Sequence, residues 1–311
     1  MSTSAPLSND ALWPRAGGWP PSLAGDADVT LLGVPAWRTS LSPTGAHATP
    51  AAIREALRRY SPALMPSDTN PDGADLGALR VVDLGDVEEP DGPEGEARTR
   101  AAVAEASTRS RLVVALGGDN SVTVATAQGA LGDLSTAGLI TLDAHYDLRD
   151  GVSNGSPVRR LIEAGLDGRR VVQLGIADFA NSAAYARRAT ELGITVVHVD
   201  ELRSLGMVLA MPEALDVAGA GGGRIHLDID VDVCDRSVAP GCPASMPGGL
   251  AAWELRAAVR AAARDPRVVS ADIAEVDATA DTPDGRTVRL AALLVLELLA
   301  VSFEPGEDGG G

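Results

Sequence analysis

The chain has 311 residues, of which 45% are hydrophobic and 3% aromatic, and its formal net charge at pH 7 is −17. This length and hydrophobic content are enough to bury a large core. All 26 basic residues are arginines that form no cluster, so we do not expect nucleic acid as a partner, because a phosphate backbone is bound by clustered cations. No apolar run approaches the roughly 20 residues of a membrane helix, and the first residues show no signal pattern, so we expect a cytoplasmic protein that does not enter a membrane.

Eight short apolar runs, rich in β-branched residues, alternate with alanine-rich stretches along the chain. Continuous apolar runs of this length are typical of strands in a parallel sheet that is covered on both faces. Their alternation with helical stretches predicts a doubly wound α/β fold. The predicted strands are residues 29–34, 80–85, 111–117, 138–143, 170–176, 194–200, 224–231 and 267–276.

Two of the predicted helices begin with a hydroxyl residue followed by proline. Thr49-Pro50 precedes AAIREALRRY and Ser156-Pro157 precedes VRRLIEAGL, which predicts an N-cap at each hydroxyl residue. We therefore expect one α/β domain over residues 1–311, a three-layer α/β/α arrangement with about eight mostly parallel strands. Outside its core we expect an N-terminal extension (1–25), an acidic surface loop (86–97) and a disordered tail (304–311).

Polar side chains follow four of the predicted strands at the point where each strand ends. In doubly wound sheets, ligands bind outside the carboxyl ends of the strands. We therefore expect these four segments to form the functional site. They are GGDN (117–120), DAHYD (143–147), DVCD (232–235) and EVD (275–277).

Paired carboxylates at these strand ends indicate a metal site. Asp143, Asp147, Asp230 and Asp232 would repel one another when packed together, and buried like charges either shift their pKa values or bind a cation. Two divalent ions would neutralise four carboxylates. The spacing of two residues also lets each pair of side chains point the same way from an extended segment.

Taken together, these motifs resemble those of the ureohydrolases, the arginase, agmatinase and formiminoglutamase family. The resemblance runs from LLGVP at 31–35 to about Asp277, through GGDN, DAHYD, DIDVDVCDRSVAPGCPASMPGG and SADIAEVD. The DLR at 147–149 and the NGSP at 154–157 are most similar to formiminoglutamases. The resemblance implies an arginase-like fold with two manganese ions that hydrolyses the C–N bond of a small linear amidine. We also expect a homo-oligomer.

By this resemblance the metal ligands are Asn120 and five side chains of the DAHYD and DIDVD segments. Asn120 stands where the family has a histidine ligand. Its amide oxygen carries no charge, so we expect the metal position beside it to be weak or empty. Within DIDVD the family spacing to the downstream glycines selects Asp230 and Asp232 rather than Asp228. The other ligands are Asp143, His145 and Asp147.

The resemblance also assigns catalytic roles. Asp147 passes a proton from the attacking water to the departing amine, and Glu275 hydrogen-bonds the planar nitrogens of the substrate. The alternative for Glu275 is a solvated loop acid. Asn154, a further expected substrate contact, stands where hydrolases of guanidino substrates commonly carry a histidine.

Arginines near the DAHYD segment favour an anionic substrate. Arg149 can pair with a substrate carboxylate in bidentate fashion, and Arg159 and Arg160 add positive charge nearby. The alternative for Arg149 is a salt bridge to Asp150 or another acid. His47 lies in the loop after the first strand and could also reach the site.

We therefore predict a manganese-dependent hydrolase that converts N-formimino-L-glutamate to L-glutamate and formamide, a step of histidine degradation. An agmatinase or another guanidino-acid hydrolase is the alternative within the same family. A pseudoenzyme acting as a binding or regulatory subunit is a second alternative, although such a chain has little reason to keep so many acids together. A nucleotide-binding protein is disfavoured because GGDN lacks the glycine pattern of phosphate-binding loops.

Overall fold

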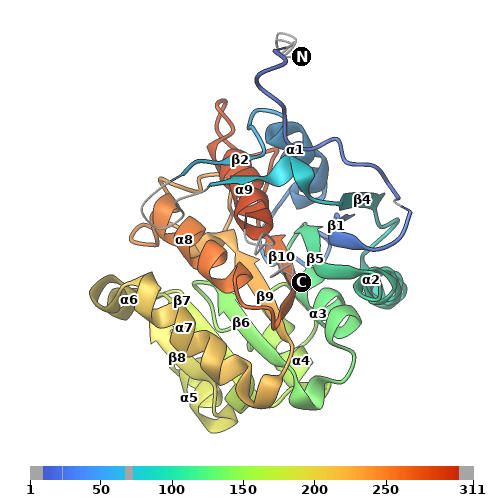
Figure 1. Ribbon diagram of the computed structural model, residues 1–311. Helices are drawn as coiled ribbons and strands as arrows, with labels where there is room; N and C mark the ends of the chain where they lie inside the picture. Colours follow the sequence, from blue (N-terminus) through green and yellow to red (C-terminus); the bar gives the residue numbers. More distant parts are fainter. Residues whose placement is uncertain (1–9, 23, 67–72, 301–311) are drawn as a thin grey trace.

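The computed structural model describes residues 10–22, 24–66 and 73–300 (Figure 1). Within these residues, eight parallel strands form one sheet in the order β4-β1-β5-β10-β9-β6-β7-β8. The eight predicted strands and the three-layer fold are therefore confirmed. The strands are β1 (Ala27–Val34), β4 (Val81–Asp86), β5 (Ser110–Gly117), β6 (Gly138–Leu142), β7 (Val171–Ile176), β8 (Thr195–His198), β9 (Ile225–Asp230) and β10 (Val268–Ala274), with a separate antiparallel pair, β2 (Ala63–Leu64) and β3 (Ala74–Asp75).

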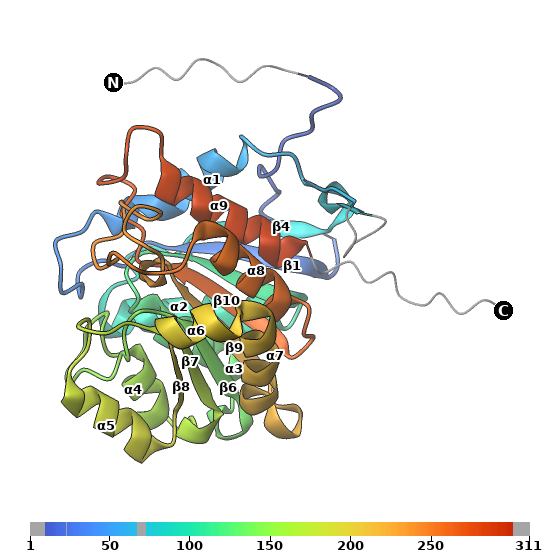
Figure 2. The ribbon, with the colours of Figure 1, turned by 90° about the vertical axis from the view of Figure 1, so that its left-hand side faces the viewer.

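Helices cover both faces of the sheet. On one face lie α1 (Thr49–Leu57), α6 (Val199–Leu205), α7 (Met207–Ala218), α8 (Ala252–Ala263) and α9 (Arg286–Leu299). On the other lie α2 (Gly92–Ser107), α3 (Val122–Leu131), α4 (Pro157–Glu163) and α5 (Ala183–Leu192). Figure 2 shows α1 and α9 side by side, although they come from opposite ends of the chain. None of the helices in the described residues is long and apolar enough to span a membrane.

The apolar strands pack against helices on both faces of the sheet. Leu31 and Val114 pack on the face covered by α1, α8 and α9, whereas Leu32 and Val113 pack on the face covered by α2 and α3. Successive residues of a strand point to opposite faces, so a strand that is buried on both faces needs an unbroken apolar run.

The order of the strands in the sheet brings the four predicted segments together. The last two strands of the chain, β9 and β10, lie between β5 and β6. As a result, the four strands that are followed by GGDN, DAHYD, DVCD and EVD are direct neighbours at the centre of the sheet. Because all four are parallel, their carboxyl ends meet at one edge.

Two local predictions about helix starts need correction. Thr49 is already helical, the N-cap position is Ala48, and the Thr49 hydroxyl donates to the backbone carbonyl of Val276 instead of capping the helix. Ser156 does occupy the N-cap of α4, but its hydroxyl donates to the carbonyl of Ser153 at 2.8 Å rather than accepting from the helix. In both cases a contact outside the helix uses the hydroxyl.

The acidic segment 86–97 is not a loop throughout. Asp86 ends β4, and α2 already begins at Gly92, with Pro93 and Glu94 in its first turn. Proline and an acid are both favoured in the first turn of a helix, because the first amide N–H groups lack partners and the helix dipole favours negative charge. Only residues 87–91 connect the two elements.

The predicted terminal segments are described only in part. Within 1–25, Ala16 is buried in the core and its N–H donates to the carbonyl of Tyr60 at 2.9 Å. The predicted tail at 304–311 lies outside the described residues. The assignment of a single domain to residues 1–311 stays a prediction.

Candidate active site

A cavity of about 420 Å³ opens at the carboxyl ends of the central strands. Its lining brings together residues from three of the four predicted segments and from the loop that follows DAHYD. They include His145, Asp147, Arg149, Asn154, Asp230, Asp232 and Glu275.

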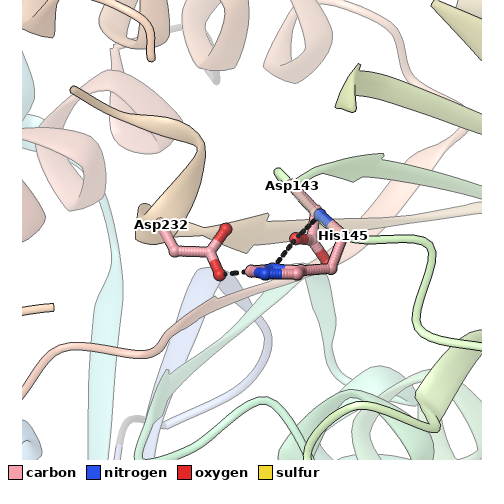
Figure 3. A group of neighbouring side chains, drawn as sticks. All are labelled: Asp143, His145 and Asp232. Atoms are coloured by element: carbon pink, nitrogen blue, oxygen red, sulfur yellow. Dashed lines mark hydrogen bonds and ion pairs between the residues drawn. The ribbon is translucent and has the colours of Figure 1, made fainter. Parts of the chain in front are cut away.

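Three side chains at this edge face one another closely (Figure 3). Nδ1 of His145 lies 2.8 Å from Oδ2 of Asp232 and 3.4 Å from Oδ1 of Asp143. Backbone N–H groups hold both acids, since Ala144 donates to Asp232 at 3.0 Å and His145 donates to Asp143 at 2.6 Å. One ligand atom from each of the three side chains lies within 4.8 Å of the others, which places them close enough to share a metal ion.

A short turn after β9 positions the aspartates of DIDVD. Residues Val231–Val233 form a 3-10 helix in which Oδ1 of Asp230 accepts the N–H of Asp232 at 2.8 Å. This cap is a local property of aspartate, which favours the N-cap position. The turn keeps both carboxylates buried at the edge of the cavity.

The acids of this cluster are buried without compensating arginines. Burial, assisted by the charge of Asp232, raises the pKa of Asp143 to about 7. Burial also raises the pKa values of Asp147 and Asp230 well above their usual range. The charge of Asp232 raises the pKa of His145 to about 12. Among the described residues no arginine forms an ion pair with these acids, and His145 is their cationic partner. Burial therefore favours the protonated acids, whereas a bound divalent cation would favour the ionised ones.

The donor set fits a hard divalent metal. Oδ2 of Asp143 is buried and accepts no hydrogen bond from the described residues. A buried carboxylate oxygen without a donor is costly unless a cation binds it. Carboxylate oxygens with one imidazole are suitable ligands for manganese.

Two acids of the site have a left-handed backbone conformation. φ is +52° at Asp147 and +62° at Glu275. For residues other than glycine this conformation costs on the order of 1–3 kcal/mol and persists only where surrounding contacts impose it. Such strain is commonly found at functional sites.

Asn120 turns its amide nitrogen toward the acids. Its Nδ2 donates to Oδ2 of Asp147 at 2.6 Å, and its Oδ1 accepts the hydroxyl of Thr123 at 2.8 Å. In this arrangement Asn120 holds Asp147 in place. Whether it also binds a metal stays a prediction.

Glu275 is anchored from two sides. Oε1 accepts the backbone N–H of Asn120 and Nδ2 of Asn154, both at 2.8 Å. Burial raises the pKa of Glu275 to about 8, although the hydrogen bond from Asn154 acts in the opposite direction. Glu275 is therefore a buried acid at the cavity, not a solvated one.

The predicted cations have different surroundings. Arg149 lines the cavity, and its guanidinium pairs with none of the described acids. Asp150, the partner that the alternative predicted, pairs instead with Arg188 at 2.8 Å. Arg160 instead forms a bidentate pair with Glu96, at 2.8 and 2.6 Å.

Two further predicted residues lie away from the cavity lining. Arg159 pairs with Glu163 and donates to the carbonyl of Arg149. His47 is exposed, and its ring packs against Trp37 with 5.2 Å between centroids. The structure therefore brings neither side chain to the acids.

The sequence interpretation missed several parts of the cavity wall, among them Leu41, Ala244 and the loop after β7. The loop between β7 and α5 contributes Phe179, Ala180, Asn181 and Ser182. Asn181 is tied to the DAHYD segment, since it accepts the N–H of Tyr146 at 3.1 Å and donates to the carbonyl of Ala144 at 2.8 Å. The position of this loop after a predicted strand was a usable signal, but the four residues that line the cavity carry no charge that would have drawn attention.

Comparisons with known proteins agree on one family. The family model described as "Arginase family" matches residues 27–300. Formimidoylglutamase of Bacillus subtilis is 35% identical over 283 residues, covering 86% of this chain and 85% of the relative, and that of Halalkalibacterium halodurans is 33% identical over 278 residues with the same coverage.

Solved structures give the same picture. The crystal structure of Bacillus subtilis formimidoylglutamase matches with a TM-score of 0.87 and 31% identity, covering 98% of this chain and 97% of that one. The structure of Trypanosoma cruzi formiminoglutamase with Mn²⁺₂ matches with a TM-score of 0.80 and 24% identity, covering 88% and 93%, and this second likeness shows the fold alone.

Proposed function

This chain belongs to the arginase family, and on that premise we propose that it hydrolyses N-formimino-L-glutamate to L-glutamate and formamide. It is a hydrolase of C–N bonds in linear amidines. The observation that carries the proposal is the cluster of buried acids around His145, with which no arginine of the described residues pairs. Beside this cluster, Arg149 lines the cavity without an acidic partner in the described part of the chain.

We propose that two manganese ions bind at this cluster. Asp143, His145, Asp147, Asp230 and Asp232 would hold them, and the orphaned oxygen of Asp143 supports this assignment. Bound divalent ions polarise the amidine and lower the pKa of a water so that it can attack near neutral pH. The position beside Asn120 would bind its ion more weakly, because the amide oxygen is turned to Thr123.

The side chains of the cavity then direct the proton transfers. Water adds to the formimino carbon, and the bond from this carbon to the glutamate nitrogen breaks. Asp147 accepts a proton from the attacking water and returns it to the leaving nitrogen. The amide of Asn120 donates to this carboxylate at 2.6 Å and keeps it oriented.

Glu275 would bind the amidine nitrogens. A planar N–H pair needs an oriented acceptor, and the hydrogen bonds from Asn120 and Asn154 leave the carboxylate little freedom to rotate. Asn154 would therefore act on the substrate mainly through Glu275.

The unpaired Arg149 favours an anionic substrate tail. N-formimino-L-glutamate carries two carboxylates, whereas agmatine ends in a cation. Once metal ions neutralise the acids, a free guanidinium makes the cavity wall positive and attracts a carboxylate. This favours formiminoglutamate over agmatine, the alternative within the family. The retained acids likewise favour an enzyme over a binding subunit that has lost its metal.

The test is an assay of manganese-loaded protein with formiminoglutamate, agmatine, arginine and a guanidino acid. Formamide and L-glutamate should be the main products, released from formiminoglutamate. Efficient turnover of agmatine, with no reaction of formiminoglutamate at any manganese loading, would move the agmatinase alternative to first place. A homo-oligomer and a cytoplasmic location also belong to this proposal and are checked by sedimentation and by cell fractionation.

A further inference from the structure

Phe179 is a large apolar side chain in an unusual position. It lies in the loop between β7 and α5 and is 99% exposed. It lines the active-site cavity and also a neighbouring cavity of about 470 Å³, and Asp232 lines both as well. An apolar side chain of this size gains free energy when it is removed from water, so full exposure at the mouth of a cavity needs an explanation.

The backbone of Phe179 is also strained. Its φ is +65°, a conformation that bulky side chains rarely adopt. The described residues other than glycine with positive φ are Glu89, Asp147, Phe179 and Glu275, and the last three line the active-site cavity. Strain at Phe179 therefore accompanies strain at two acids of the site, which is the pattern of a functional position.

The loop around Phe179 is anchored although its side chain is free. The N–H of Ala177 donates to the carbonyl of Ala144 at 3.0 Å, and Nδ2 of Asn181 donates to the same carbonyl at 2.8 Å. Both ends of the turn are thus fixed to the DAHYD segment. A rotation of the side chain would move the ring while the anchored ends of the loop stay in place.

A second exposed apolar side chain lines the same cavity. Leu41 is 57% exposed, and its backbone N–H donates to Oδ1 of Asn154 at 3.0 Å. Asn154 in turn donates to Glu275. The Leu41 segment is therefore tied to a proposed substrate contact, just as the Phe179 loop is tied to the proposed metal ligands.

The interior of the cavity differs sharply from these two side chains. Its floor and walls carry Asp147, Asp230, Asp232, Glu275 and Arg149. Charged contacts weaken when water fills the site, and they strengthen when an apolar cover excludes it.

We propose that Phe179 closes over a bound substrate toward Leu41 and seals the cavity against water. The identity of the substrate rests on the function proposed above, but the cover is expected for whichever linear amidine the enzyme hydrolyses. Phe179 would thus be a substrate-enclosing residue that lowers KM through contact with the bound molecule.

Substitution tests the cover by kinetics. Phe179→Ala should raise KM by about ten- to one-hundredfold, the ratio that burial of one large apolar side chain is worth, and Phe179→Leu should recover part of the loss. The matched control is Trp253→Ala, an aromatic residue on α8 that is 70% exposed and does not line the cavity. Its KM should not change. All three variants should melt at the temperature of the parent protein, since neither ring is packed.

A second experiment follows the environment of the Phe179 ring by ¹⁹F NMR. The chain contains two phenylalanines, at 179 and 303, so fluorophenylalanine labelling gives a simple ¹⁹F spectrum in which Phe179→Leu identifies the signal. Adding the amidine that is turned over best, to manganese-loaded protein that carries Asp147→Asn to prevent turnover, should shift the Phe179 signal.

These experiments distinguish the proposed closure by Phe179 from the proposed identity of the substrate. Failure to hydrolyse formiminoglutamate would contradict only the proposed function, because the kinetics and spectra use the preferred amidine. A KM within twofold of the parent in Phe179→Ala would overturn the cover. A change of oligomeric state in that variant, without a change in KM, would overturn it too, by placing Phe179 in a contact between copies of the chain.

Discussion

Two sets of buried acids in this protein have opposite surroundings. Glu297 of α9 is 2% exposed and is bound by two arginines of α8, with Arg256 at 2.7 Å and Arg260 at 2.5 Å. The acids at the carboxyl ends of β6, β9 and β10 are equally buried, yet none of the described arginines pairs with them. Among the described residues, the chain therefore supplies two arginines to Glu297, whereas the several strand-end acids share only His145 as a cationic partner.

We interpret Glu297 as a structural acid and propose that the strand-end acids are functional. A buried carboxylate is costly unless it is paired, so natural proteins place arginine beside an acid that only holds helices together. A cluster of buried acids with too few cations of its own becomes less costly when an external cation binds it. The comparison thus supports a metal site at the strand ends more strongly than the count of acids alone.

The largest expected effect follows from removing one acid of the functional set. Asp232→Ala deletes the carboxylate that contacts both His145 and the N–H of Ala144. We expect activity to fall at least a thousandfold, which is about 4 kcal/mol, with reduced manganese content and an intact fold. Metal analysis by mass spectrometry and circular dichroism check this. An unchanged metal content would contradict the assignment of Asp232 as a ligand.

The structural set should respond to loss of its cations. The double variant Arg256→Ala/Arg260→Ala leaves Glu297 buried without a partner. We expect a loss of about 3 kcal/mol in the free energy of unfolding, at the lower end of the range for a broken buried pair, because both guanidinium groups are about one-third exposed. Urea unfolding measures the loss, and manganese content should stay unchanged. A drop in bound metal would show that the two sets are not independent.

We propose that Arg149 binds the substrate, since it lines the cavity and pairs with no acid of the described residues. Arg149→Ala should weaken kcat/KM by about 1.5–3 kcal/mol, the worth of a hydrogen bond to a charged group. Arg149→Lys should recover part of this, since the bidentate fork is lost. Arg169→Ala is the control, because Arg169 is 80% exposed and pairs only locally with Asp167. Equal values of kcat/KM in Arg149→Ala and Arg169→Ala would contradict a contact between Arg149 and the substrate.

The smallest expected effect is a gain in stability of the metal-free protein rather than a loss. Asp230→Asn removes a buried charge that burial disfavours, so the protein freed of metal by chelation should become more stable by about 0.5–2 kcal/mol. The same variant should bind less manganese. Thermal unfolding with and without a chelator compares the two states. A loss of stability in the chelated variant would mean that Asp230 already has an adequate partner within the chain.

Much of the fold could be predicted because it depends on local patterns. The eight apolar runs became the eight parallel strands, and the polar segments after four of them lie at one edge. Local capping was less certain. Thr49 has the signature of an N-cap, but it lies within the helix, and its hydroxyl bonds instead to the carbonyl of Val276, which is 227 residues away.

The partners of the arginines could not be predicted from the chain alone. Arg149 and Arg160 both follow the DAHYD segment closely in the sequence, and nothing next to them in the chain shows which one has an acidic partner. Arg160 is neutralised by Glu96, 64 residues away on α2, whereas Arg149 stays unpaired at the cavity. Likewise, the loop with Phe179 joins the site only because β7 lies beside β6.

The sequence by itself determined the strands, their polar carboxyl ends and the spacing of acids and histidine within DAHYD and DIDVD, because these depend on residues that are close along the chain. Tertiary structure alone decided that β9 and β10 lie between β5 and β6, and so brought Asp143, Asp232 and Glu275 to one cavity. It also decided which charges are neutralised. Ion pairs and strand neighbours join segments that are far apart in sequence, so only the packed sheet and its helices bring such partners within bonding distance.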